Sequence, residues 1–197
     1  MTAFRLDYSL GAAFLTWSEG RAHVIVHHEG VPYVGVSECA CDEPFAMRLG
    51  IIGGLPPTAS LQRDSSGVFS LGGALGSHTV RHTQLSEEIP FCGTFQGGAR
   101  SEVNGGSVAL QFAVDASGAL SGVIHTPPGP LLMQGRVSLF GHATIDVQGA
   151  EGAIGQTGGL FGNLLPCVPG VEAKGVYTGG AGDYGHWWAE LEPFSRG

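Results

Sequence analysis

Between Leu131 and Val147 the chain alternates, and every odd-numbered position is small or apolar. These positions are Leu131, Met133, Gly135, Val137, Leu139, Gly141, Ala143, Ile145 and Val147. After Leu132 the even positions are mostly polar, with Phe140 as the exception. A period of two is typical of a β-strand, because successive side chains point to opposite faces. One strand of this length would span ~55 Å. The pattern therefore predicts two strands in continuous register, or one strand bent at Gly135 or Gly141.

The first 40 residues predict a meander. The expected strands are residues 12–18, 22–28 and 31–37. The turns between them are Glu19-Gly20 and Glu29-Gly30, since glycine accepts the positive φ that tight turns need. One face would carry Leu15, Trp17, Val24, Val26 and Tyr33, and the other Phe14, Ile25, Val34 and Val36. A sheet that is apolar on both faces has to be covered on both.

A second meander begins at Ser107, where Val108, Leu110, Phe112 and Val114 alternate. Residues 115–118 (Asp-Ala-Ser-Gly) predict a hairpin turn, and residues 120–126 the returning strand. Residues 53–66 are expected to form a long loop that holds one helical turn. Residues 83–89 are expected to form a second short helix that ends before Pro90.

Together these elements predict a single all-β domain over residues 1–197. The expected architecture is an antiparallel β-barrel or rolled sheet of meander hairpins, with one or two short helices. Glycine at the bends favours closure, which removes exposed sheet edges. A β-sandwich is the alternative.

Composition narrows the classes of partner. The chain carries a formal charge of −8, with 34 glycines, and Lys174 is its only lysine beside eight arginines. Such a chain has no basic patch for nucleic acid or an anionic membrane. The arginine bias is typical of GC-rich, bacterial coding sequences. Charged residues are 13% of the chain, which fits either a homo-oligomer or a monomer with a neutral polar surface.

The N-terminus has neither the apolar core nor the cleavage site of a signal peptide, which predicts a cytoplasmic protein whose four cysteines are reduced. Residues 180–185 match G-x-G-x-x-G. Dinucleotide binding also requires a helix, a second strand and an acidic residue about 20 positions further on, and this combination does not follow here. Neither the histidines nor the Cys39-Ala40-Cys41 pattern has the spacing of a metal site. The sequence therefore predicts no cofactor and no metal.

The candidate catalytic residues lie on the polar side of the long alternating segment. They are Arg136, His142 and Asp146, with His125 on the strand before. If this side lined a barrel lumen, His142 and Asp146 could exchange protons while Arg136 stabilised an anionic oxygen. In the alternative, these polar positions face water.

The candidate ligand-binding residues lie near the C-terminus. They are Tyr177, Tyr184, His186, Trp187 and Trp188, and they could stack on a flat ligand or a sugar. Adjacent tryptophans on a strand point to opposite faces, so only one can share a pocket with His186. In the alternative, one tryptophan plugs a barrel end.

Three functions fit these features, and no motif identifies a family. The first is a barrel that binds a small apolar or amphipathic molecule, as a cofactor-independent isomerase, cyclase or lyase. The second is a non-catalytic ligand or carbohydrate binder. The third is an oligomeric structural or assembly subunit, which would have no sizeable pocket.

Overall fold

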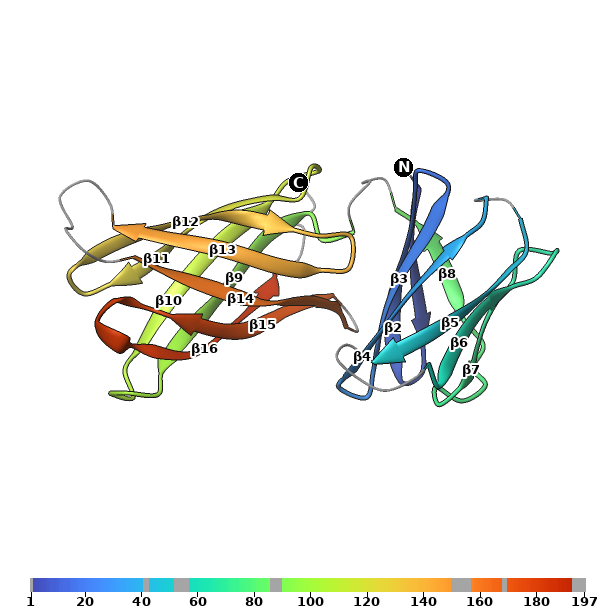
Figure 1. The fold of residues 1–197 in the computed structure, drawn as a ribbon, viewed down its shortest axis with the longest axis horizontal. Helices are drawn as coiled ribbons and strands as arrows, with labels where there is room; N and C mark the ends of the chain where they lie inside the picture. The colour runs from blue at the N-terminus through green and yellow to red at the C-terminus, as the bar shows by residue number, and fades with distance from the viewer. Residues whose placement is uncertain are drawn as a thin grey trace. The chain divides into compact units, whose positions relative to one another are not determined.

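The chain folds as two antiparallel β units, seen in Figure 1. The computed structural model describes residues 2–40, 43–51, 57–85, 90–149, 157–167 and 170–192. One unit comprises Met1–Pro90 with Leu165–Pro169, and the other Phe91–Leu164 with Gly170–Gly197. The sequence predicts a single domain over residues 1–197, and this stays a prediction. A period of two shows which side chains share a face, but it does not show where one sheet ends and the next begins.

The first unit is a sheet of eight strands that nearly closes on itself. Its order is β7-β6-β5-β4-β3-β2-β1-β8, and one isolated bridge pairs Ser70 on the edge strand β7 with Thr79, which precedes the other edge strand, β8. The strands are β1 (Thr2–Tyr8), β2 (Gly11–Ser18), β3 (Arg21–His28), β4 (Val31–Glu38), β5 (Phe45–Ile51), β6 (Ala59–Arg63), β7 (Phe69–Gly73) and β8 (Arg81–Gln84). The first three strand pairings follow chain order, as a meander requires.

The predicted N-terminal hairpins are confirmed. Both residues of each turn have positive φ: Glu19 at 52° with Gly20 at 76°, and Glu29 at 48° with Gly30 at 84°. One of the two predicted apolar faces, Leu15, Trp17, Val24, Val26 and Tyr33, lies in the core of this unit. On the other face Phe14 and Ile25 are also buried, whereas Val36 is exposed.

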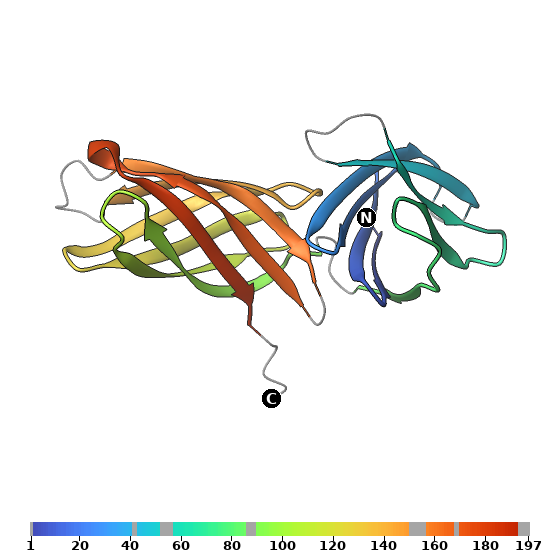
Figure 2. The ribbon, with the colours of Figure 1, turned by 90° about the horizontal axis from the view of Figure 1, so that it is seen from below.

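The second unit is a closed barrel, so the predicted all-β barrel class is confirmed. Its order is β10-β11-β12-β13-β14-β15-β16-β9, and Figure 2 shows these strands wrapping around the barrel at a tilt. The strands are β9 (Gly93–Ser101), β10 (Ser107–Val114), β11 (Ala119–Thr126), β12 (Gly129–Val137), β13 (His142–Gly149), β14 (Thr157–Pro166), β15 (Val171–Thr178) and β16 (Tyr184–Leu191). Closure comes from the pairing of β16 with β9, which lie far apart in the sequence.

The long alternating segment is two strands, β12 and β13, joined by a turn. Pairing in this hairpin always joins two odd or two even positions, as in Val137 with Ala143 and Met133 with Val147. The alternation therefore continues through the turn, in which Gly141 has a φ of 73°. Met133, Ala143, Ile145 and Val147 are buried in the barrel.

One turn design recurs in both units, at Asp64–Gly67 and Asp115–Gly118. The Asp64 Oδ1 accepts hydrogen bonds from the Ser66 backbone and hydroxyl and from the Val68 backbone. The Asp115 Oδ1 accepts the equivalent three bonds from Ser117 and Ala119. The glycine that closes each turn has positive φ. The turn predicted at 115–118 is thus confirmed.

The two predicted short helices are wrong within the described residues. Part of the expected loop at 53–66 is strand β6, and the start of the expected helix at 83–89 belongs to β8. Residues 52–56 and 86–89 lie outside the described residues. Pairing with neighbouring strands outweighs a weak local preference in such short segments. The single helical element in the described ranges is a 3₁₀ turn at Gly180–Gly182, and no helix there is long and apolar enough to cross a membrane.

Candidate functional site

An aromatic layer packs inside the barrel. Phe95 and Phe112 stack with ring centroids 4.8 Å apart, and Phe112 meets Trp187 edge to face at 6.2 Å. The Trp187 indole donates a hydrogen bond to the Phe161 carbonyl at 3.2 Å. It occupies space left by Gly162 and Gly175, where an added Cβ would lie 2.6 Å and 2.7 Å from the indole. This part of the barrel is a packed core.

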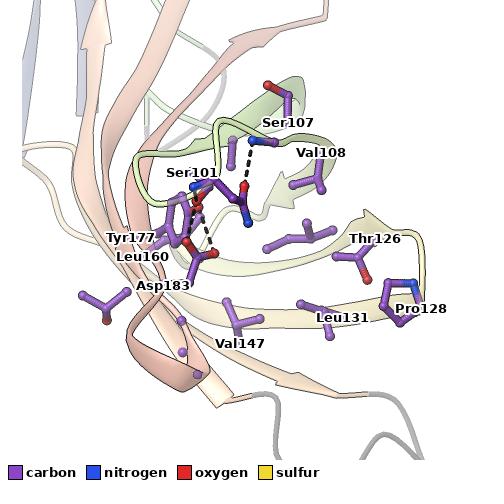
Figure 3. A pocket seen from close by; sticks show the side chains of 18 of the residues that line it. Ser101, Ser107, Val108, Thr126, Pro128, Leu131, Val147, Leu160, Tyr177 and Asp183 are labelled. Carbon is purple, nitrogen blue, oxygen red and sulfur yellow. Dashed lines mark hydrogen bonds between the residues drawn. The ribbon is translucent and has the colours of Figure 1, made fainter.

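Beyond this layer the barrel holds a cavity of about 510 Å³. Two of the strands that carry the aromatic layer also line the cavity further along, β9 through Ala99 and Ser101 and β10 through Val108. The rest of its wall is largely apolar and includes Leu131, Val147 and Leu160, which Figure 3 labels. Ile124 lines it as well. A volume of this size is in the range that holds a small organic ligand.

One side of the cavity carries a cluster of three polar side chains, Ser101, Tyr177 and Asp183 (Figure 3). The Ser101 hydroxyl donates to the Asp183 Oδ1 at 2.6 Å, and the Tyr177 hydroxyl donates to the Asp183 Oδ2 at 3.2 Å. The two carboxylate oxygens are thus held by two hydroxyls from different strands. We call these three residues the polar cluster.

Local backbone structure fixes the polar cluster. Ser101 ends β9, and its Oγ accepts hydrogen bonds from the backbone N–H groups of Val103 and Asn104 in the following turn. Asp183 follows the 3₁₀ turn, and its carbonyl accepts a bond from the Gly179 N–H at 2.7 Å. Both side chains are therefore placed by turns at the end of the barrel.

Burial raises the pKa of the Tyr177 phenol, and the nearby Asp183 carboxylate adds to this rise. The phenol therefore stays neutral at physiological pH and donates its hydrogen to the carboxylate, while its oxygen can still accept a bond. Of the described residues that line the cavity, Asp183 is the only charged one.

The predicted catalytic residues do not line the cavity. Arg136, His142, Asp146 and His125 are exposed on the outer face of the barrel. Asp146 lies opposite Gln134, and Arg136 lies opposite Thr144, so they do share one face of β12 and β13. This is the alternative in which polar positions face water. A catalytic role for them stays a prediction, and the geometry offers it no enclosed site.

The predicted ligand-binding residues fall into three places. Tyr177 belongs to the cavity, and Trp187 to the aromatic layer. Tyr184, His186 and Trp188 lie on the outer face, where the Nε2 of His186 is 3.7 Å from a Glu102 carboxylate oxygen. As expected from the strand geometry, only one tryptophan shares the side of His186.

Sequence reasoning did not find Ser101 or the apolar lining from Val108 to Leu160. The alternation along each strand could have indicated them, because they occupy inward-facing positions near the ends of their strands. For metal binding, the described residues contain no group of three His, Cys, Asp or Glu side chains that could hold an ion, and Cys41 lies outside them. No known protein family, curated protein or solved structure matches this chain.

Proposed function

We propose that the second unit binds a small, largely apolar molecule in its barrel cavity, with the polar end of the ligand against Tyr177 and Asp183. The observation that carries this proposal is the contrast inside one barrel. Aromatic side chains pack one part of the barrel interior, whereas a largely apolar space of about 510 Å³ lies beyond them with the polar cluster on one side. Apolar walls with a few convergent polar groups are typical of sites that bind and orient small molecules.

The cavity favours binding over an assembly role, because an assembly subunit has no need of a sizeable pocket. We further propose that the bound molecule is the substrate of an isomerase, cyclase or lyase activity. Its proton-transfer groups would then be Tyr177 and Asp183, since they are the titratable side chains that line the cavity. A carbohydrate ligand is disfavoured, because sugars need many polar partners and this wall is largely apolar.

The test compares two neighbouring leucines of β12. Leu131 lines the cavity, whereas Leu132 is 45% exposed on the outer face. Titration of the full chain with the fluorescent apolar probe N-phenyl-1-naphthylamine is expected to show saturable binding at one site. Leu131→Trp should place a larger side chain in the cavity, occupy part of the probe site and weaken binding at least tenfold, about 1.4 kcal/mol.

Leu132→Trp adds the same side chain outside the cavity and should leave the affinity unchanged. Absence of saturable binding to the wild-type chain would contradict the proposal. So would equal probe affinity in the two variants, provided that both give the amide NMR pattern of the folded barrel.

A further inference from the structure

The negative charge of Asp183 in the barrel cavity has no counter-ion among the described residues that line it. Asp183 is the one ionisable carboxylate there, and no lysine, arginine or histidine accompanies it in that lining. Within the described part of the chain, its two side-chain hydrogen-bond donors, the hydroxyls of Ser101 and Tyr177, are neutral. They orient the carboxylate and leave its negative charge in place.

The polar cluster also has unused capacity to accept hydrogen bonds. An ionised carboxylate offers about four acceptor positions, and the hydroxyls of Ser101 and Tyr177 occupy two of them. The Tyr177 oxygen, whose hydrogen is committed to Asp183, can accept as well. A ligand group that donates several hydrogen bonds therefore fits the cluster better than one that only accepts.

We propose, building on the proposed function, that the cavity selects lipophilic amines: the protonated amine binds Asp183 and Tyr177, and the apolar body lies against Val108, Ile124 and Leu131. A protonated amine supplies both things that the cluster lacks, a positive charge and up to three N–H donors. Its bond to the carboxylate is charge-assisted and so stronger than the bond of a neutral hydroxyl.

The same reasoning ranks other head groups on one apolar body. An alcohol can donate a single neutral hydrogen bond, so it should bind about tenfold more weakly than the amine. A carboxylate should bind most weakly, because its charge repels that of Asp183 across an apolar space in which solvent screens poorly.

The experiment uses decylamine, decan-1-ol and decanoate, which share one chain and differ in the head group. Each displaces N-phenyl-1-naphthylamine from the full-length wild-type chain near neutral pH, below its aggregation concentration. The expected order of affinity is amine, then alcohol, then carboxylate. Asp183→Asn keeps the shape of the side chain and removes the charge, so it should lower the amine affinity about tenfold, leave the alcohol unchanged and strengthen decanoate binding.

Asp146→Asn is the matched control, because it removes one carboxylate from the exposed outer face of the same barrel. It should leave all three affinities unchanged. Equal wild-type affinities for the amine and the alcohol would overturn the amine selection, and so would an amine affinity that Asp183→Asn does not alter. If Asp183→Asn fails to fold, the wild-type ranking of the three head groups decides the question.

These outcomes separate the two proposals. If the probe binds and Leu131→Trp blocks it while the head groups are not distinguished, the binding function stands and the amine selection fails. If neither the probe nor any of the three molecules binds the wild-type chain, the binding function itself fails.

Discussion

Trp187 and Trp188 are adjacent in the chain and lie on opposite sides of the barrel wall. Trp187 is 1% exposed and packs inside, whereas Trp188 is 47% exposed and its ring lies over Gly98 on the outer face. Strand β16 thus uses one tryptophan to fill the barrel and the other to shield a glycine of the neighbouring strand β9.

The first prediction compares these two side chains. Trp187→Ala removes the ring that Gly162 and Gly175 accommodate, and the resulting void should lower the free energy of unfolding of the second unit by about 3–5 kcal/mol. Trp188→Ala should cost less than about 1 kcal/mol. Urea unfolding followed through the NMR amide signals of β9–β16 measures both, and similar losses in the two variants would contradict the placement of Trp187 in the core.

The second prediction concerns the space beside Trp187. In Gly162→Ala the new Cβ would meet the Lys174 carbonyl and lie 2.6 Å from the indole, so we expect a loss of about 1–3 kcal/mol. Gly170→Ala is the control in the same unit, since a Cβ there would have no atom within 4 Å. Thermal unfolding of the two variants under one set of conditions compares their stabilities. A Gly162→Ala variant as stable as Gly170→Ala would show that the strands beside Gly162 shift to accommodate the added Cβ.

The third prediction concerns stability in alkaline solution. Burial raises the pKa of the Tyr8 phenol, and the neighbouring Tyr33 and Glu29 raise it further. Because the unfolded phenol ionises first, near pH 10, the contribution of Tyr8 is complete below that pH and declines above it. Urea unfolding of the first unit between pH 8 and pH 11 should therefore show stability falling above pH 10.

Tyr8→Phe should make this decline shallower. It also removes the hydrogen bond between Tyr8 and the His28 ring, 3.1 Å long, at a cost of about 1 kcal/mol at neutral pH. Tyr184→Phe removes an exposed phenol instead and serves as the control. An unchanged alkaline slope in Tyr8→Phe would argue against the effect of burial.

The fourth prediction tests the outer polar row. Arg136→Ala, His142→Asn and Asp146→Asn change exposed side chains, so each should alter the free energy of unfolding by no more than about 0.5 kcal/mol. None should change the affinity for the apolar probe, because none lines the cavity. A marked loss of probe binding in any of these variants would indicate that the outer polar row takes part in ligand binding.

The sequence pattern predicts the fold class because period-two alternation identifies strands and their two faces. It placed Met133, Ile145 and Val147 together on one face, and they are buried together. It did not predict β6, although Asp64–Gly67 repeats the Asp-x-Ser-Gly pattern of the correctly predicted turn at Asp115–Gly118. That repetition was an available signal for a hairpin between β6 and β7.

The candidate site was harder to predict, because it depends on closure of the barrel. Ser101 and Asp183 are 82 positions apart in the sequence and meet since β9 pairs with β16. No local pattern reports such a pairing. Alternation also leaves open which face of β12 and β13 points inward, so Arg136 on β12 and Asp146 on β13 could be assigned to a lumen as well as to solvent.

The recurring aspartate turn makes the stability of both units depend on pH in acidic solution. Hydrogen bonds from Ser66 and Ser117 lower the pKa of Asp64 and of Asp115 respectively, and the backbone bonds to each carboxylate act in the same direction. Their stabilisation is complete above about pH 4 and is lost as the pH falls through the lower pKa of each folded carboxylate. The same acid-sensitive turn therefore occurs once in each of the two sheets, and acidification below about pH 4 should weaken one hairpin in each unit.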